Sequence, residues 1–365
     1  MIGHKQTECE PNKICLLRHG VEYSKNQSFI ACIADAICYT KKPVYRITEM
    51  KQIIIAMLTI DNFIVYQNGT LVTEFYDKNR QINVNAPKYT DSRLFSKTRG
   101  DPNKIAYFTK VCNAFEGFSK FLASEDATID YTYLWDLLST PHPSIFENGA
   151  NLVILEVPML DITDNVNIVC PTNHYTSKKY DPSKPTLIFF TQDGFFEPIF
   201  TLRTTHIEEQ NQDVRYVGKF FREQSADSIP EIKFLFEMVI KPFYEKMCKP
   251  MASMPKIYKA KHPINLKTLL DICRENDYEM SKQIVNYQGK VIGVMVKPTG
   301  FKAYVFVPCF PSAVDDSIDY EFMLNTTIWN GYTETRDTLQ FIQRDTGGLI
   351  PCCLLYTSPE PTRPY

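Results

Sequence analysis

The chain has 365 residues, of which 44% are hydrophobic, and 40 Lys and Arg against 42 Asp and Glu give a formal net charge of -2. This composition excludes a chain that is disordered throughout, because it is apolar enough for the cores of two or three domains, and it excludes a uniformly basic protein. The most apolar stretch, Ile53 to Ile60, is far shorter than the about 20 residues of a membrane span, and Met1 to Gly20 has no apolar stretch typical of a signal peptide. We therefore expect a soluble intracellular protein whose 11 Cys are thiols and form no disulfides.

Helical periodicity dominates the first third of the chain, and we expect a mainly helical region over residues 1–148. Ser24 and Gln27 have the spacing of a capping box, and apolar residues from Phe29 to Ile37 follow on one helical face. A second helix is predicted over Thr48 to Leu58, and a third begins at Asp101 and Pro102. The third helix carries a long apolar stripe of Ile105, Phe108, Val111, Phe115, Phe118 and Leu122.

The pattern changes to that of strands from Asn151, and residues 149–248 read as an α+β region. Strands are predicted over Asn151 to Val157, Val166 to Cys170 and Thr186 to Phe190. The dipeptide Asp193-Gly194 favours a two-residue hairpin turn, because both of its residues tolerate positive φ. These segments predict an antiparallel sheet.

A helix with Pro230 in its first turn is predicted over Ser228 to Met247, and Pro242 should end or kink it. Its apolar side is expected to hold Phe234, Leu235, Met238 and Val239. Residues 249–263, with three Pro, form a predicted linker, and residues 264–350 a small α+β domain. That domain has four predicted elements, namely a helix at Leu266 to Arg274, a hairpin at Gln288-Gly289, a strand at Tyr304 to Val307 and a helix at Glu334 to Gln343.

The predicted fold class is therefore α+β, with a helical N-terminal region followed by antiparallel-sheet regions and interspersed helices. The sequence contains no G-x-x-x-x-G-K-S/T loop, no G-x-G-x-x-G, no G-x-S-x-G, no H-E-x-x-H and no C-x-x-C. No enzyme class is indicated by a motif, and no cofactor is expected.

Charge is segregated along the chain. Phe121 to Ser177 holds eight carboxylates and no Lys or Arg, whereas Lys241 to His262 holds six Lys against Glu245 alone. Lysines neutralise backbone phosphates and aromatic rings stack on bases, so the second stretch is the candidate nucleic-acid site. Its candidate residues are Lys241, Lys246, Lys249, Lys256, Lys259, Lys261, Tyr244 and Tyr258. A second basic segment, Lys88 to Lys104, has five cations and two Asp; both segments could equally be solvated surface.

Three other sets of residues each allow a functional and a purely structural interpretation. His4, Cys9, Cys15 and His19 could bind zinc, but their spacing is irregular and buried or free thiols are the alternative. Glu156, Asp161 and Asp164, with Lys178, Lys179 and Lys184 beyond, could form a Mg²⁺-dependent nuclease site or a solvated sheet edge. Cys170 and Cys309 each lie beside a Pro at a predicted strand end, where a buried thiol is the simpler reading.

The C-terminal residues resemble something other than protein-coding sequence. Cys353 to Pro359, continuing as Glu360 to Arg363, is similar to a translated transposase sequencing adaptor. We therefore expect residues 353–365 to be an artefact and the native chain to continue differently after Cys352.

Several blocks of the sequence resemble a protein family of nucleocytoplasmic large DNA viruses. The blocks are LLRHGVEYSKNQSFIACIAD (Leu16 to Asp35), LTIDNFIVYQNGTLVTEF (Leu58 to Phe75), VCPTNHY (Val169 to Tyr175), GFFEPIF (Gly194 to Phe200), QIVNYQGKVIGV (Gln283 to Val294) and VPCFPS (Val307 to Ser312). They are similar to the large subunit of the viral early transcription factor in its giant-virus form.

The resemblance implies an interior fragment of a non-enzymatic, DNA-binding subunit of an early-gene transcription initiation factor. It implies three partners, which are double-stranded promoter DNA, a helicase-like ATPase small subunit and the viral RNA polymerase, and no membrane. It also implies a location in the virion and in the viral factory of the host cytoplasm. A structural or scaffold protein of the virion is the alternative from another class, and the Mg²⁺-dependent nuclease is a third.

Overall fold

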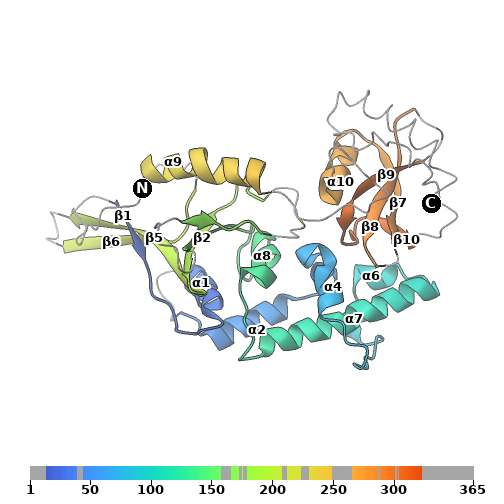
Figure 1. The fold of residues 1–365 in the computed structure, drawn as a ribbon, viewed down its shortest axis with the longest axis horizontal. Helices are drawn as coiled ribbons and strands as arrows, with labels where there is room; N and C mark the ends of the chain where they lie inside the picture. The colour runs from blue at the N-terminus through green and yellow to red at the C-terminus, as the bar shows by residue number, and fades with distance from the viewer. Residues whose placement is uncertain are drawn as a thin grey trace, which may run out of the picture. The chain divides into compact units, whose positions relative to one another are not determined.

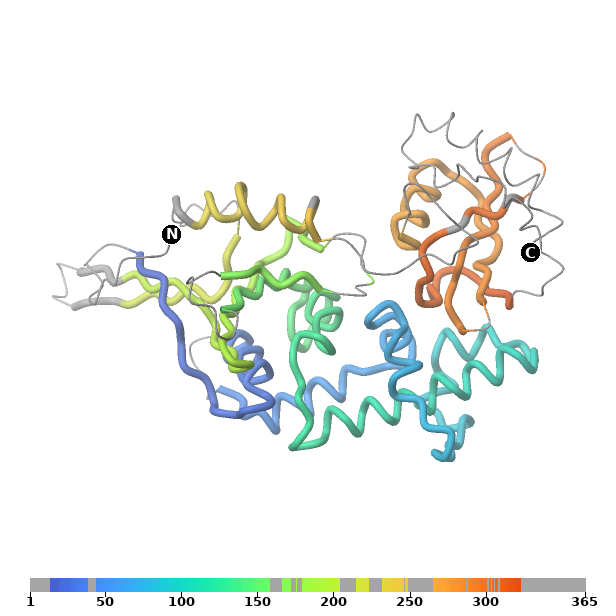
Figure 2. Tube along the Cα trace, viewed as in Figure 1, coloured from blue at the N-terminus to red at the C-terminus, as the bar shows by residue number. Residues whose placement is uncertain are grey.

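The computed structural model describes residues 14–38, 44–157, 166–171, 175, 179–207, 212–222, 230–248, 265–286, 288–300, 302 and 304–322 (Figures 1 and 2). The chain divides into two compact units, each of which combines segments that are far apart in the sequence. Unit 1 comprises Met1–Met57, Phe121–Thr172 and Lys178–Lys249, and unit 2 comprises Leu58–Lys120, Asn173–Ser177 and Pro250–Tyr365.

Unit 1 is built on a six-stranded mixed sheet with the strand order β1-β5-β4-β2-β3, in which β6 also pairs with β5. The strands are β1 (Ile14–Arg18), β2 (Asn151–Val157), β3 (Asn167–Ile168), β4 (Thr186–Gln192), β5 (Phe195–Ile207) and β6 (Gln212–Gly218). The predicted hairpin at Asp193-Gly194 is confirmed, with φ of 52° and 77° at its two residues. The expectation of a purely antiparallel sheet is wrong, because β2 and β4 run parallel.

The centre of this sheet is covered on both faces. Five consecutive residues at the start of β2, from Asn151 to Leu155, are buried, and successive residues of a strand point to opposite faces. Helices α1 (Ser28–Ile37) and α8 (Tyr131–Ser139) contact β5 and β2 respectively, whereas Figure 1 shows α9 (Pro230–Leu235) on the opposite side of the sheet from α1. Burial on both faces explains why β2 reads as a continuous apolar run.

Helix α1 begins where the sequence predicts a helix, but its N-terminal residues do more than cap it. Ser24 Oγ accepts a hydrogen bond from the Gln27 amide at 3.1 Å, but the N-cap of the helix is Gln27, so Ser24 closes the turn before the helix and does not form the predicted capping box. The Gln27 side chain instead donates to the carbonyls of Ser124, Glu125 and Ala127. Lys51 of α2 (Ile47–Met57) donates to the Ser124 carbonyl at 2.6 Å and to those of its neighbours, so two polar side chains hold this bend of the main chain.

The helical segment of residues 230–247 departs from the prediction. It contains two π-helical stretches, η3 (Phe236–Ile240) and η4 (Phe243–Met247), on either side of Pro242. Phe234 and Met238, which were expected in the core, are 61% and 62% exposed. The wider turn of a π-helix changes which residues face the sheet, so a pattern counted at 3.6 residues per turn selects the wrong side.

A long helix, α7 (Pro102–Ala123), lies mostly in unit 2, as predicted from its N-cap and stripe, and its residues from Phe121 onward belong to unit 1. The stripe residues from Phe108 to Leu122 are buried, but Ile105 is 41% exposed. Phe63 packs on both Phe115 and Phe118 of α7 with ring centroids 5.7 and 5.5 Å apart. The shorter helices are α3 (Ile60–Phe63), η1 (Tyr66–Gly69), α4 (Thr70–Glu74), α5 (Pro87–Thr90) and α6 (Arg93–Ser96).

The sheet part of unit 2 has the strand order β10-β7-β8-β9. Its elements are α10 (Leu266–Glu275), β7 (Glu279–Val285), β8 (Val291–Lys297), β9 (Val305–Ser312) and β10 (Asp319–Phe322). The predicted helix at Leu266 and the hairpin at Gln288-Gly289 are confirmed, whereas β10 pairs parallel with β7. The predicted helix at Glu334 to Gln343 and the linker of residues 249–263 lie outside the described residues.

The fold class is α+β, with two mixed sheets and helices that do not alternate regularly with strands. Within the described part of the chain, no helix is both long enough and apolar enough to cross a membrane.

Candidate functional site

Most of the predicted nucleic-acid residues fall outside what the structure describes. Lys249, Lys256, Lys259, Lys261 and Tyr258 lie in residues 249–264, and the side chain of Lys246 is likewise outside the described part. Lys241 follows η3 and is partly buried.

Tyr244, the remaining residue of that set, has a structural role. It is 4% exposed, and its hydroxyl donates towards the carbonyls of Leu152 and Val169 at 3.3 Å each. Its ring also packs against Trp135. A ring enclosed in this way offers no face to a base, so the prediction of stacking by Tyr244 is corrected.

The second basic segment, Lys88 to Lys104, is used inside unit 2. Lys97 Nζ donates to the carbonyls of Asp316 and Ile318, and Arg93 pairs with Asp61 and Asp316. The other three cations pair with Glu116 or Asp319, namely Lys88, Arg99 and Lys104. The five charges therefore join helical and sheet segments of the unit and make no uncompensated basic patch.

An exposed three-stranded arm extends the sheet of unit 1. We define the arm as β1, β6 and residues 199–207 of β5, which pairs with β1 along one edge and with β6 along the other. Tyr216 and Val217 are 56% and 39% exposed. Because neighbouring residues of a strand point to opposite faces, exposure of both means that, among the described residues, nothing covers either face of β6 at this point. Figure 2 shows the arm reaching past the strands that form the core of the unit.

One face of the arm combines a cation with an aromatic ring. Arg203 lies opposite Ile14 on β1 and opposite Tyr216 on β6, so these three side chains form one row across the arm. Arg203 and Tyr216 are both exposed. We call Ile14, Arg203 and Tyr216 the arm row.

Glu197, in the first part of β5, is paired with Arg18. Arg18 Nε donates to Glu197 Oε2 at 2.8 Å, and the Arg18 guanidinium lies 4.2 Å from the centre of the Phe190 ring. The Arg18–Glu197 pair is therefore largely neutral.

A pocket of about 530 Å³ lies beside the base of the arm, lined by His19, Glu22, Asp35, Tyr45 and Arg46 with small apolar neighbours. The Asp35 carboxylate is buried, accepts a hydrogen bond from Lys219 at 3.0 Å and lies 3.4 Å from His19 Nδ1. An imidazole held by a carboxylate is the arrangement that orients a general base.

Cys32, on the same helix as Asp35, does not add a reactive thiol to this pocket. It is fully buried, and burial first, then the Asp35 charge, raises the pKa of its thiol well above the usual value. The pocket therefore has an exposed imidazole beside a buried carboxylate but gains no thiolate nucleophile from Cys32.

The other candidate sites are only partly described. Glu156 lies at the exposed end of β2, whereas Asp161, Asp164 and Lys178 are outside the described residues. Of the zinc candidates, His4 and Cys9 are also outside, Cys15 lies in β1 and His19 faces Asp35. Across the described ranges, no group of three or more His, Cys, Asp or Glu is placed to hold a metal ion.

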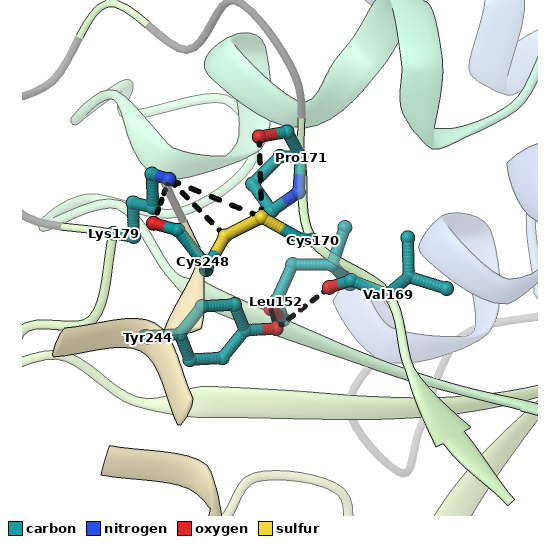
Figure 3. Close-up of a disulfide and its surroundings, with 7 residues drawn as sticks. All are labelled: Leu152, Val169, Cys170, Pro171, Lys179, Tyr244 and Cys248. Carbon is teal, nitrogen blue, oxygen red and sulfur yellow. Dashed lines mark hydrogen bonds between the residues drawn. A yellow bond between two sulfur atoms is a disulfide. The ribbon is translucent and has the colours of Figure 1, made fainter. Parts of the chain in front are cut away.

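The expectation that no cysteines are paired is wrong for one pair. Cys170, just after β3, and Cys248, just after η4, form a disulfide with 5.4 Å between their Cα atoms (Figure 3). Residue spacing gives no signal for this pair, because the two Cys are 78 positions apart. The buried thiol expected at Cys309 is confirmed, since Cys309 is buried and is not part of a disulfide.

The arm row could not be predicted from local sequence patterns. Its three members come from three strands, so no local run contains them, although Arg215-Tyr216 within an alternating strand is a weak signal. No family model, no curated protein and no solved structure matches this chain.

Proposed function

We propose that this chain is a non-enzymatic subunit of a viral early-gene transcription initiation factor, and that it contacts promoter DNA through the arm row together with the basic segment of residues 241–262. The resemblance of the sequence blocks to the large subunit of that factor supports the viral and transcriptional part of the proposal. Under this proposal the protein partners are the helicase-like ATPase subunit and the viral RNA polymerase, and the chain acts in the virion and the viral factory.

The observation that carries DNA contact is the exposed pairing of Arg203 with Tyr216 on a sheet face. A guanidinium binds phosphate oxygens through several N–H groups at once, and an exposed ring can stack on a base or on a sugar. A two-stranded ribbon fits the major groove of duplex DNA, so strands β5 and β6 can bring both side chains to the nucleic acid.

The surroundings of the arm row favour an anionic partner. Glu197 is neutralised by Arg18. Arg215, next to Tyr216 in β6, is exposed and adds a positive charge near the same strand edge. In the sequence, residues 241–262 hold six Lys against one Glu.

The proposal is tested by fluorescence anisotropy of a labelled promoter duplex over a range of salt concentrations. Arg203→Gln combined with Tyr216→Ala should weaken binding about tenfold, since one stacked base is worth about 1–3 kcal/mol. The slope of log affinity against log salt should fall by about 0.9 for the phosphate contact that is lost. Arg222→Gln, which removes an exposed cation outside the arm, is the matched control and should leave both quantities unchanged.

A second variant separates the arm row from the basic segment. Neutralising Lys246, Lys249, Lys256, Lys259 and Lys261 together should lower the salt slope further and independently of the arm variant. If the arm variant binds as the wild type does, the arm row is not the DNA contact; if neither variant changes retention, the DNA assignment fails.

A structural or scaffold role in the virion remains the alternative, and one observation favours protein contact. Strands β1 and β6 each pair only with β5 among the described residues, so each presents one open edge, and Leu16 and Val217 are exposed beside them. Retention of the wild-type chain on capsid or core proteins, with no DNA affinity at low salt, would select this alternative.

A further inference from the structure

The Cys170–Cys248 disulfide has an unequal environment at its two sulfur atoms. Lys179 Nζ lies 3.1 Å from Cys248 Sγ but 3.9 Å from Cys170 Sγ, and it also donates to the Cys248 carbonyl (Figure 3). Cys248 is 6% exposed, whereas Cys170 is only partly buried. Cys170 is therefore the more exposed of the two residues, and Cys248 Sγ is the sulfur closer to the amine.

Lys179 has neutral groups as its partners at this site. Among the described residues, its hydrogen-bond partners are the two sulfurs and the Cys248 carbonyl oxygen. Burial lowers the pKa of its ammonium group. A buried cation without an anion beside it is unfavourable. A thiolate at Cys248 would supply that anion at a distance of about 3 Å.

We infer that Cys170–Cys248 is a thiol–disulfide exchange site, at which a dithiol attacks Cys170 Sγ and releases Cys248 as a thiolate held by Lys179. In the first step a reductant thiolate bonds to Cys170 Sγ, the bond between the two cysteine sulfurs breaks, and its electron pair goes to Cys248 Sγ. In the second step the other thiol of the reductant displaces Cys170 from the mixed disulfide. The reductant becomes a cyclic disulfide; the proton of its second thiol ends on Cys170, the proton of its first thiol has gone to solvent, and Cys248 remains a thiolate beside the Lys179 ammonium.

The direction of attack follows from general thiol chemistry. Exchange is faster when the leaving sulfur has the lower pKa and when the attacked sulfur is accessible. A neighbouring ammonium stabilises a thiolate. Both conditions select Cys170 as the attacked atom and Cys248 as the leaving atom.

Cleavage would release a defined part of unit 1. Cys248 directly follows η4, whose Tyr244 hydroxyl donates to main-chain carbonyls of the β2 and β3 region. The disulfide joins the same two regions covalently, so its reduction leaves the end of the helical segment attached by non-covalent contacts alone. The inference does not depend on the proposed DNA contact.

The experiment measures disulfide reduction by dithiothreitol under pseudo-first-order conditions, with alkylation of new thiols followed by mass spectrometry. Lys179→Met should slow reduction on the order of threefold to tenfold at neutral pH, because the leaving thiolate loses its cation. Lys233→Met, which removes an exposed lysine of α9, is the control and should reduce at the wild-type rate.

A second readout does not depend on the first. In Cys170→Ser, the alkylation rate of Cys248 should rise at a lower pH than it does in the same variant carrying Lys179→Met. Equal reduction rates for wild type and Lys179→Met, together with equal pH profiles, would overturn the role of Lys179. Recovery of Cys170 and Cys248 as unpaired thiols from protein kept under air would overturn the site itself.

Discussion

Asn68 offers the sharpest test of how unit 2 is held together. It lies in η1 between α3 and α4, with φ of 54° and ψ of 37°, in the left-handed region that costs most residues energy. Its side chain contacts the end of β9, 244 positions away in the case of Ser312. Replacing Asn68 by Ala and by Gly separates the cost of the side-chain contacts from the cost of the backbone conformation.

The contacts of Asn68 set the size of the effect. Its Oδ1 accepts hydrogen bonds from Ser312 Oγ at 2.5 Å and from the Ala313 amide at 2.9 Å, and its Nδ2 donates to the Pro311 carbonyl at 3.0 Å. Ala313 is 1% exposed, so its unpaired amide alone costs about 1–3 kcal/mol. With the other two bonds, Asn68→Gly should lower the free energy of unfolding by about 3 kcal/mol. Asn68→Ala should cost about 1 kcal/mol more, because Ala disfavours positive φ.

Hydrogen exchange measured by mass spectrometry reports the loss locally, which matters because two units need not unfold in one transition. Peptides that cover β9 and α4 should lose protection in the order wild type, Asn68→Gly, Asn68→Ala, while peptides of unit 1 keep theirs. The reasoning is refuted if Asn68→Ala lies within about 1 kcal/mol of wild type, or if Asn68→Gly is the less stable of the two.

Three further predictions concern the stability of the chain. Burial, and to a lesser extent the charge of Lys110, lower the pKa of Lys290 from 10.5 to about 8. The charged form of Lys290 therefore destabilises unit 2 by about 3 kcal/mol below pH 8, and this destabilisation fades as the pH rises towards 10.5. Urea melts between pH 7 and 9.5 should show stability rising in the wild type relative to Lys290→Met; a constant difference would contradict this assignment. Lys51→Met should cost unit 1 about 2–4 kcal/mol in urea melts, since it removes charged hydrogen bonds to buried carbonyls, and a cost below about 1 kcal/mol would show that water replaces them. Replacing Cys170 and Cys248 by Ser should lower the melting temperature by an amount equivalent to at most about 4 kcal/mol, and added reductant should then have no further effect.

The elements that the sequence predicts well are those with local signals. Helix α7 has a Pro at its first position and a long stripe, and the turns at Asp193-Gly194 and Gln288-Gly289 place residues that tolerate positive φ between alternating strands. Asn68-Gly69 is the same kind of turn signal, but it joins two helices, so rules for hairpin turns do not identify it. Local chemistry therefore predicts turns more widely than hairpin rules suggest.

Contacts between distant segments could not be predicted from spacing. The parallel pairing of β2 with β4 depends on which strand takes the place beside β2 in the sheet. The Cys170–Cys248 pair depends on where the π-helical stretch η4 ends. Neither is encoded within a window of ten or twenty residues. For the same reason, each domain predicted from the sequence is one continuous segment, whereas each unit of the structure combines segments that are separated in the sequence.

Charge shows the same limit, and it bears directly on function. A count along the chain makes Lys88 to Lys104 a basic segment, but its counter-charges, among them Asp316 and Asp319, arrive from more than 200 positions away and neutralise it. Arg203, by contrast, belongs to no basic run, and it becomes part of an exposed surface because two neighbouring strands bring Ile14 and Tyr216 beside it. The fold therefore decides which charges are exposed on a surface, and a count along the sequence does not show it. Substitutions that test nucleic-acid contact should therefore be chosen across the strands of the arm before they are chosen along a lysine-rich segment.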